Sequence, residues 1–407
     1  MTAIEANDVL TQITEERCAE LLIELIRQRS VVGEKTTAHT WMTERLSAFG
    51  MDVEQFGVDG TLAPMVFGRR EQGDLPGVLF DGHFDTVFAE PGDWSRDPWG
   101  GQREGDLVYG RGAVDSKGSV AAMLAAVEAV LAADVPLRGP LYFMSDSDGE
   151  RAFRGAALLA DLDISRRVGS VFSAEATSNR RIEIAYPGIS TWKVTAIGRT
   201  AHPTEPSKGV NAVAVMANLV RAVADGRMVL TEGSSRWFVP RVTTNAIRTM
   251  PGGGWAIPAR CDVVLSVLSP NGVTLDDVRR DIDRFLRGME AEDGSVSYER
   301  KLLPMGGGRL WLRPGEVDPD HEGVLALKSA IRAVTGEEAT IGPFNGGWVD
   351  GAELMRPDAR GFGSPGCLVF GPGDFELAHT VDEHISVSEV TVAARVYALA
   401  ALELLTS

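Results

Sequence analysis

The fold is decided by a stretch that begins Leu79-Phe80-Asp81-Gly82-His83-Phe84-Asp85-Thr86-Val87 and ends Tyr109-Gly110-Arg111-Gly112-Ala113-Val114-Asp115-Ser116-Lys117-Gly118. The apolar run that ends at Phe80 predicts a buried strand. His83 and Asp85 follow it two residues apart, so an extended chain points both to the same side. An imidazole beside a carboxylate is typical of a metal ligand with its orienting partner, or of a base with its orienter.

The second half of this stretch places a single carboxylate, Asp115, among three glycines, Gly110, Gly112 and Gly118. Glycines let the backbone approach another group closely. The alanine-rich run that begins at Ser119 predicts a helix. Asp115 is therefore expected in a tight loop just before that helix.

Further along the chain, polar residues again follow predicted strands. The run 141–144 ends before Ser145-Asp146-Ser147-Asp148-Gly149-Glu150, and the run 168–172 ends before Glu175. With the helices between them these strands form a β-α-β-α-β alternation, which indicates a doubly wound α/β domain. In such a sheet reactive side chains gather where the strands end. The region of about thirty residues between Asp85 and Asp115 is expected to be a functional loop.

The pattern changes near Tyr186. The predicted elements from there to Leu302 follow the order β-α-β-β-α-β, which indicates a small α+β domain of ferredoxin-like type inserted whole into the chain. After Leu303 the α/β pattern returns. We therefore expect one domain formed by residues 1–186 and 303–407 and a second formed by residues 187–302.

The composition narrows the classes of function. Lys and Arg number 40 and Asp and Glu number 57, which gives a net charge of −17 and argues against nucleic acid or an anionic membrane as a partner. The three cysteines are far apart in the sequence, which is typical of a reducing compartment. We find neither an apolar run long enough to span a bilayer nor a signal-peptide core. A soluble cytoplasmic protein with a small-molecule substrate is expected.

The polar residues expected at strand ends form one set of two imidazoles and three carboxylates, namely His83, Asp115, Asp148, Glu175 and His379. Divalent metal ions bind this mixture of ligands. Two ions a few ångströms apart need about five protein ligands, one of them bridging. Asp115 is the natural bridge because it is central and has two oxygens. We expect zinc, manganese or cobalt, with one or two ions per subunit.

The sequence resembles the two-metal aminoacylase/carboxypeptidase metallopeptidases, a family that includes acetylornithine deacetylase, succinyl-diaminopimelate desuccinylase and glutamate carboxypeptidase. The resemblance lies in the motifs 82–87, 110–118 and 175–177, in the segment 198–212, and in the final motif 371–383. It implies that His83 and Glu175 bind one ion, that Asp148 and His379 bind the other, and that Asp115 bridges them. The inserted domain is expected to act as a lid and to form a homodimer or a higher oligomer.

The same resemblance implies roles for residues around the metal ions. Asp85 would hydrogen-bond His83, and His202 is similar to a small-domain histidine that reaches a partner's active site and steadies an oxyanion. Asn245 resembles a polar group near the substrate, and Gly346 and Gly347 resemble a loop near the substrate's carboxylate. Arg248, with Arg241 and Arg260, is a candidate to hold an anionic substrate.

Two departures from the family stand out. Relatives carry two consecutive glutamates after the strand 141–144, a general base and then a metal ligand, where this chain has Ser147 and Asp148. A serine hydroxyl does not accept a proton near neutral pH. Asp146 or Glu150 is then expected to replace the base, or the metal-activated water acts with little help. Val267 also stands where relatives often have an arginine.

We therefore expect a metal-dependent hydrolase that cleaves a C–N bond of a small, carboxylate-bearing substrate, as an amidohydrolase, deacylase or carboxypeptidase does. Two alternatives stay open because of the residue at Ser147. The protein is a hydrolytic deaminase of an electron-poor aromatic amine, or it is an inactive protein that binds a ligand through its metal ion.

Overall fold

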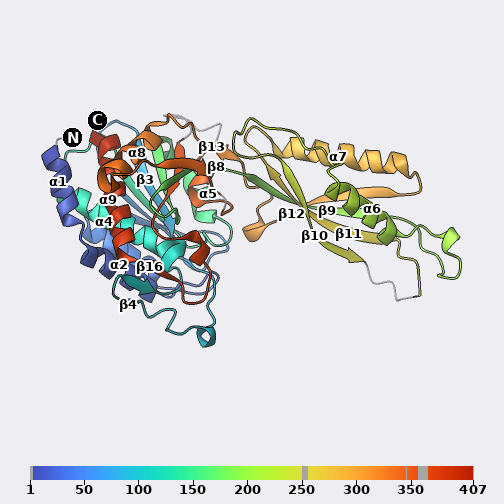
Figure 1. The fold of residues 1–407 in the computed structure, drawn as a ribbon, viewed down its shortest axis with the longest axis horizontal. Coiled ribbons are helices and arrows are strands. Elements are labelled where there is room, and N and C mark those ends of the chain that lie inside the picture. The colour runs from blue at the N-terminus through green and yellow to red at the C-terminus, as the bar shows by residue number, and fades with distance from the viewer. Residues whose placement is uncertain (1–2, 250–254, 345, 356–364, 407) are drawn as a thin grey trace. The chain divides into compact units, whose positions relative to one another are not determined.

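A computed structural model describes residues 3–249, 255–344, 346–355 and 365–406. The described chain divides into two compact units, one formed by residues 1–184 and 317–407 and the other by residues 185–316. The first unit has the α/β character and the second the α+β character expected from the sequence (Figure 1). None of the described helices is long and apolar enough to cross a membrane.

The first unit is built on a large mixed sheet. From one edge its strands are β1 (Asp52–Phe56), β2 (Met65–Arg70), β6 (Leu141–Asp146), β3 (Gly77–His83), β7 (Val168–Ala174), β15 (Gly366–Phe370) and β8 (Arg181–Tyr186). Strands β6, β3, β7 and β15 are parallel to one another, whereas β2 and β8 on either side of them are antiparallel. Short strand β14 (Thr340–Pro343) pairs with β8, and β13 (Gly315–Glu316) pairs with residues 185 and 186 of β8, which belong to the second unit. The parallel strands bring their carboxyl ends to one edge, where the sequence placed its polar residues.

The helices of the first unit are α1 (Ala3–Gln12), α2 (Glu15–Arg27), α3 (Ala38–Ala48), α4 (Gly118–Ala132), α5 (Arg154–Asp161), α8 (Glu322–Thr335) and α9 (Val387–Thr406). Successive residues of β3 face different layers. The Phe80 ring packs on Tyr397 of α9, whereas a Cβ on Gly351, in the short helix after β14, would lie 2.8 Å from the carboxylate of Asp81. Both faces of the sheet are covered, which is the doubly wound arrangement.

The region after β3 is less irregular than the sequence suggested. It contains a short hairpin of β4 (Gln102–Glu104) and β5 (Leu107–Tyr109), and β16 (His384–Ser386) completes a three-stranded sheet with it. The expectation of a thirty-residue loop is wrong in this respect. The pairing of β5 with β16 joins residues far apart in the chain, so local sequence patterns could not reveal it.

The second unit is a four-stranded antiparallel sheet in the order β10-β11-β9-β12 with two helices. Its elements are β9 (Gly188–Ile197), α6 (Ala212–Ala224), β10 (Arg241–Thr249), β11 (Arg260–Ser269), α7 (Leu275–Glu292) and β12 (Ser297–Leu303). Alternate residues of β9 and β11, such as Trp192 and Leu265, are buried against Met216 of α6 and Ile282 of α7. The β-α-β-β-α-β order and this strand order are those of a ferredoxin-like fold.

Candidate metal centre

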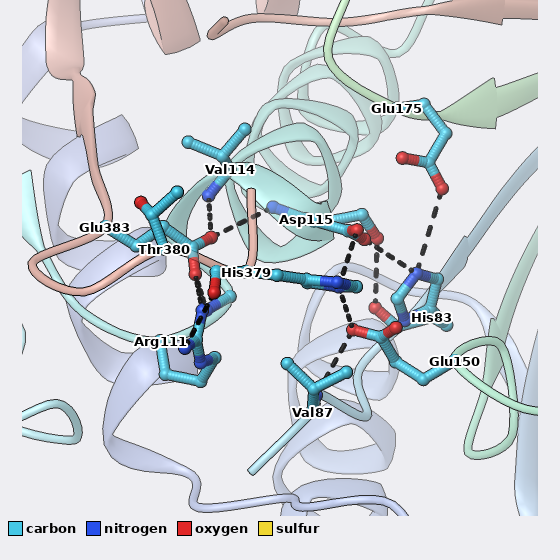
Figure 2. A network of polar contacts seen from close by, with 12 residues as sticks. His83, Val87, Arg111, Val114, Asp115, Glu150, Glu175, His379, Thr380 and Glu383 are labelled. Carbon is cyan, nitrogen blue, oxygen red and sulfur yellow. Dashed lines mark hydrogen bonds and ion pairs between the residues drawn. The ribbon is translucent and has the colours of Figure 1, made fainter. Parts of the chain in front are cut away.

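Three of the expected metal ligands meet at the carboxyl edge of the large sheet (Figure 2). His83 ends β3, Glu175 follows β7, and Asp115 lies in the loop before α4. His83 Nε2 is 3.3 Å from Asp115 Oδ1 and 3.8 Å from Glu175 Oε1. These three side chains are one of two groups among the described residues whose ligand atoms lie close enough to hold a metal ion.

The second group shares Asp115 with the first. His379 Nε2 is 3.1 Å from Asp115 Oδ2 and 3.2 Å from Glu150 Oε1. Each oxygen of Asp115 therefore faces a different histidine (Figure 2). This is the geometry that a carboxylate bridging two ions requires.

The structure differs from the sequence-based expectation at Asp148. Both oxygens of Asp148 accept hydrogen bonds from Arg154, at 2.7 and 2.8 Å, and Asp148 is in neither ligand group. Glu150, which the sequence suggested as a base, lies at the second group instead. The reason is that β6 runs two residues beyond the predicted strand end, to Asp146, so the turn that delivers the carboxylate comes later.

Ser147 is not at the metal centre either. Its hydroxyl donates to the carbonyl of Ala63 at 2.7 Å. With Glu150 as the ligand, the residue directly before it is Gly149, and a Cβ there would lie 2.4 Å from Cγ of His83. No side chain fits at this position without a shift of the ring. Asp146 is fully buried, accepts hydrogen bonds from the amides of Ser147 and Gly155, and is in neither ligand group.

Asp85 contacts one residue of each ligand group. His83 Nδ1 lies 3.0 Å from the Asp85 carbonyl oxygen and 3.4 Å from its carboxylate. The carboxylate also accepts hydrogen bonds from the amides of Gly149 and Glu150, at 3.0 and 3.2 Å. One buried side chain thus orients a histidine of the first group and fixes the turn that carries Glu150 of the second.

The carboxylates at this centre are buried close together, which favours the binding of a cation. Burial and the nearby charge of Asp115 raise the pKa of Glu175 to about 8. Hydrogen bonds to Asp115 and Glu150 raise the pKa of His379 to about 10. Burial opposes ionisation of Asp115, but its hydrogen bonds to both histidines outweigh burial and lower its pKa. Without an ion, protons on the histidines offset the crowded carboxylates, and a divalent ion would replace those protons.

The donor set fits divalent metal ions. It consists of two imidazoles and three carboxylates, the ligands that zinc and similar ions take in proteins. Glu175 Oε2 is buried and has no hydrogen-bond partner, although a buried carboxylate oxygen normally has one. An ion in the first group would satisfy it.

The other expected site residues are in neither ligand group. His202 and Asn245 are exposed in the second unit, where His202 Nδ1 is 2.7 Å from Thr204 Oγ1 and Asn245 donates to Ser266 at 2.6 Å. Arg248 is exposed on β10. Gly346 and Gly347 lie between β14 and the turn at 350–354 in the first unit, next to Asn345, which is outside the described residues.

The family model described as Peptidase family M20/M25/M40 matches residues 79–403, which include all five ligand positions of the two groups. The chain belongs to this family. It is 28% identical over 381 residues to a succinyl-diaminopimelate desuccinylase of Leptothrix cholodnii, a match that covers 90% of this chain and 94% of that protein. It is 27% identical over 355 residues to an acetylornithine deacetylase of Edwardsiella ictaluri, with 84% of each chain covered.

A solved M20 structure shares the fold. The Bacillus subtilis YXEP protein, described as a dinuclear metal-binding peptidase of the M20 family, has a TM-score of 0.69, 14% identity, and coverage of 96% of this chain and 98% of that one. The expected family and the doubly wound fold with an inserted α+β domain are confirmed. The expectation of a metal-dependent hydrolase that acts on C–N bonds is confirmed through the family.

Proposed function

We propose that this protein uses two divalent metal ions, zinc, manganese or cobalt, to hydrolyse an amide bond of a small, carboxylate-bearing substrate. The observation that carries the proposal is the position of Asp115, with one oxygen toward His83 and the other toward His379. The M20 relatives named as a desuccinylase and a deacetylase support acyl amino acids as the class of substrate.

The ligands would be His83 and Glu175 for one ion, His379 and Glu150 for the other, and Asp115 for both. Ions bound there would polarise a water molecule and the scissile carbonyl. The protein's own part is to hold these side chains in place. Asp85 fixes the His83 ring, and the same carboxylate holds the turn at Glu150.

The proton acceptor is the part of the site that differs most from the expected family pattern. Among the described residues near Glu150, Asp85 and Asp148 are occupied by amide and guanidinium donors, and Gly149 has no side chain. We assign the proton transfer to Glu150 as well, so that this carboxylate would serve both as a ligand of the second ion and as the proton acceptor; its side chain is 7% exposed and its Oε1 lies 3.2 Å from His379 Nε2. General base catalysis by such a carboxylate contributes about 10²–10⁴-fold.

A substrate panel on the reconstituted protein tests the proposal. Metal-free protein loaded with zinc, manganese or cobalt is incubated with N-succinyl and N-acetyl amino acids and with dipeptides, and the free amine is measured. We expect turnover of at least one amide substrate by the wild type and none by Asp115→Asn. Hydrolysis of none of them with any of the three ions would overturn the proposal.

The same panel, extended by electron-poor arylamines, separates the two alternatives left open by the sequence. Ammonia released from an electron-poor arylamine, without amide hydrolysis, would identify a deaminase. Metal-dependent binding of a substrate without turnover of any compound would identify a binding protein. No feature of the described site favours either one over amide hydrolysis.

The roles of the second unit also belong to this proposal. We propose that it mediates self-association, and that His202, Asn245, Arg248 and the Gly346-Gly347 loop contact the substrate. The sheet of this unit ends in the long exposed strand β10, which can accept a partner strand. Light scattering measures the oligomer, and His202→Ala is expected to lower kcat with metal content unchanged.

A further inference from the structure

A buried carboxylate that is not a metal ligand holds the loop that carries Asp115. Glu383 lies four residues after His379, and its side chain is fully buried. Its Oε1 accepts hydrogen bonds from the amides of Val114 and Asp115, at 2.8 and 3.2 Å. Its Oε2 accepts from the amide of Gly112 at 3.1 Å and from the Arg111 guanidinium at 2.6 Å (Figure 2).

The loop needs this acceptor because it is irregular. Gly112 has φ +83°, and a Cβ there would lie 2.6 Å from Thr86. Asp115 has non-helical dihedral angles of −119° and 95°. The amides of Gly112, Val114 and Asp115 therefore bond to Glu383 rather than to a helix or strand. A buried amide without an acceptor is costly, so removal of the carboxylate would let this loop rearrange.

Glu383 and Arg111 also connect this loop to the one that carries His379. The Arg111 guanidinium lies 3.4 Å from the carbonyl oxygen of His379. The main-chain oxygen of Glu383 accepts a hydrogen bond from the amide of Gly110 at 2.9 Å. The bridging ligand and a ligand of the second group are thus fixed to each other through one buried ion pair.

We propose that Glu383 is a positioning residue that holds Asp115 in its bridging geometry and thereby sets the affinity of the protein for both metal ions. This inference rests on the proposed two-metal function. Because the two oxygens of Asp115 face different histidines, a shift of its loop weakens both ions together. Loss of a ligand that belongs to one group, such as His379, weakens chiefly the ion of that group.

The test is a metal titration of Glu383→Gln. Glutamine has the shape of glutamate, but its NH₂ group would face one of two pairs of donors. These are the amides of Val114 and Asp115, or the amide of Gly112 with the Arg111 guanidinium. Metal-free protein is titrated with Zn²⁺ against a chromophoric chelator, and with Co²⁺ while its visible absorption is recorded. Outer-shell changes lower metal affinity about 10–100-fold, and we expect a loss in this range for both ions. His379→Ala is expected to weaken mainly one ion.

Asp281→Asn is the matched control. Asp281 is a buried carboxylate of the second unit, 2% exposed, that accepts a hydrogen bond from the amide of Thr231 at 2.6 Å and pairs with Arg284. Its substitution should lower the melting temperature and leave both metal affinities and the Co²⁺ spectrum unchanged. This separates a general loss of stability from an effect on the metal centre.

The outcomes are distinct. Unchanged affinities in Glu383→Gln, or a loss confined to one ion, would overturn the role of Glu383 and leave the proposed function standing. A wild-type protein that binds no Zn²⁺ or Co²⁺ would overturn the proposed function itself. If Glu383→Gln does not fold, Arg111→Lys decides by the same criterion, since it keeps the three amide bonds and should weaken both ions by a smaller factor.

Discussion

The two halves of the proposed metal centre, the group at His83 and the group at His379, are built differently. His83 ends a central strand of the sheet and its side chain is 6% exposed, whereas His379 lies on a surface loop and its side chain is 47% exposed. His379 also has a left-handed backbone with φ +60°, which costs a non-glycine residue about 1 kcal/mol. The first half is fixed by β-sheet pairing, and the second by side chains that hold a loop.

The difference indicates unequal affinity. A ligand that is already fixed loses little freedom when an ion binds, so the His83 half should bind its ion more tightly. The His379 half must hold a more exposed loop, and its ion should exchange more readily. Asp115 is the ligand that both groups share, so its loss should affect both ions directly.

Asp115→Asn should have the largest effect. The amide keeps the shape of the carboxylate but removes the charge that both ions share, so we expect loss of both ions. Activity should fall by more than the 10²–10³-fold typical of one lost electrostatic group. Metal content is measured by atomic absorption on dialysed protein, together with turnover. Retention of one tightly bound ion would show that Asp115 does not bridge.

The two histidine variants test the inequality directly. His379→Ala should leave one ion bound after dialysis, and His83→Ala should lose the tighter ion. Each loss should exceed about 10²-fold in the affinity of the ion concerned, beyond the 10–100-fold typical of outer-shell changes. Isothermal titration of the metal-free variants measures both sites. Equal residual stoichiometry and affinity in the two variants would contradict the proposed difference between the halves.

The sequence predicted the first half of this centre better than the second. A polar residue that follows a strand of apolar residues is a local signal, and it placed His83 and Glu175 at neighbouring strand ends where the structure has them. The choice between Asp148 and Glu150 depended on where β6 ends. That end is set by its pairing with β3, in which Asp146 lies opposite His83, and pairing between distant segments has no local signature.

The contacts of Glu383 were missed for the same reason. Its neighbours in the sequence suggested only the motif that carries His379, and nothing near it indicates that Gly112, Val114 and Asp115 would be its partners. Glu383 lies about 270 positions after these three residues in the chain. By contrast, the inserted unit was predicted well because alternation and helical spacing are local features.

A pair of conservative variants tests which carboxylate serves the second half. Asp148→Asn should leave the metal content unchanged and lower the free energy of unfolding. The Asp148 side chain is 2% exposed, and the substitution breaks its bidentate pair with Arg154. Loss of such a pair costs about 1–3 kcal/mol. Glu150→Gln should weaken the binding of the second ion and leave the free energy of unfolding largely unchanged. Denaturant unfolding and metal titration of both variants separate the two effects.

The pH dependence of stability needs a reference group away from the centre, and Glu183 of β8 provides it. Burial raises its pKa from 4.5 to about 7, with Arg181 opposing the shift. The folded state thus binds the proton of Glu183 more tightly than the unfolded state does. The contribution of Glu183 to stability is therefore full below pH 4.5 and is lost as the pH rises through about 7.

In Glu183→Gln that loss of stability is absent. The stability of the variant relative to the wild type should therefore grow by about 3 kcal/mol between these pH values, because each pH unit contributes about 1.4 kcal/mol, and then stay constant. Urea unfolding of the metal-free protein at several pH values measures the difference. A constant difference across this range would show that Glu183 keeps an ordinary pKa, and the pH dependence would then be assigned to groups in the two halves of the centre.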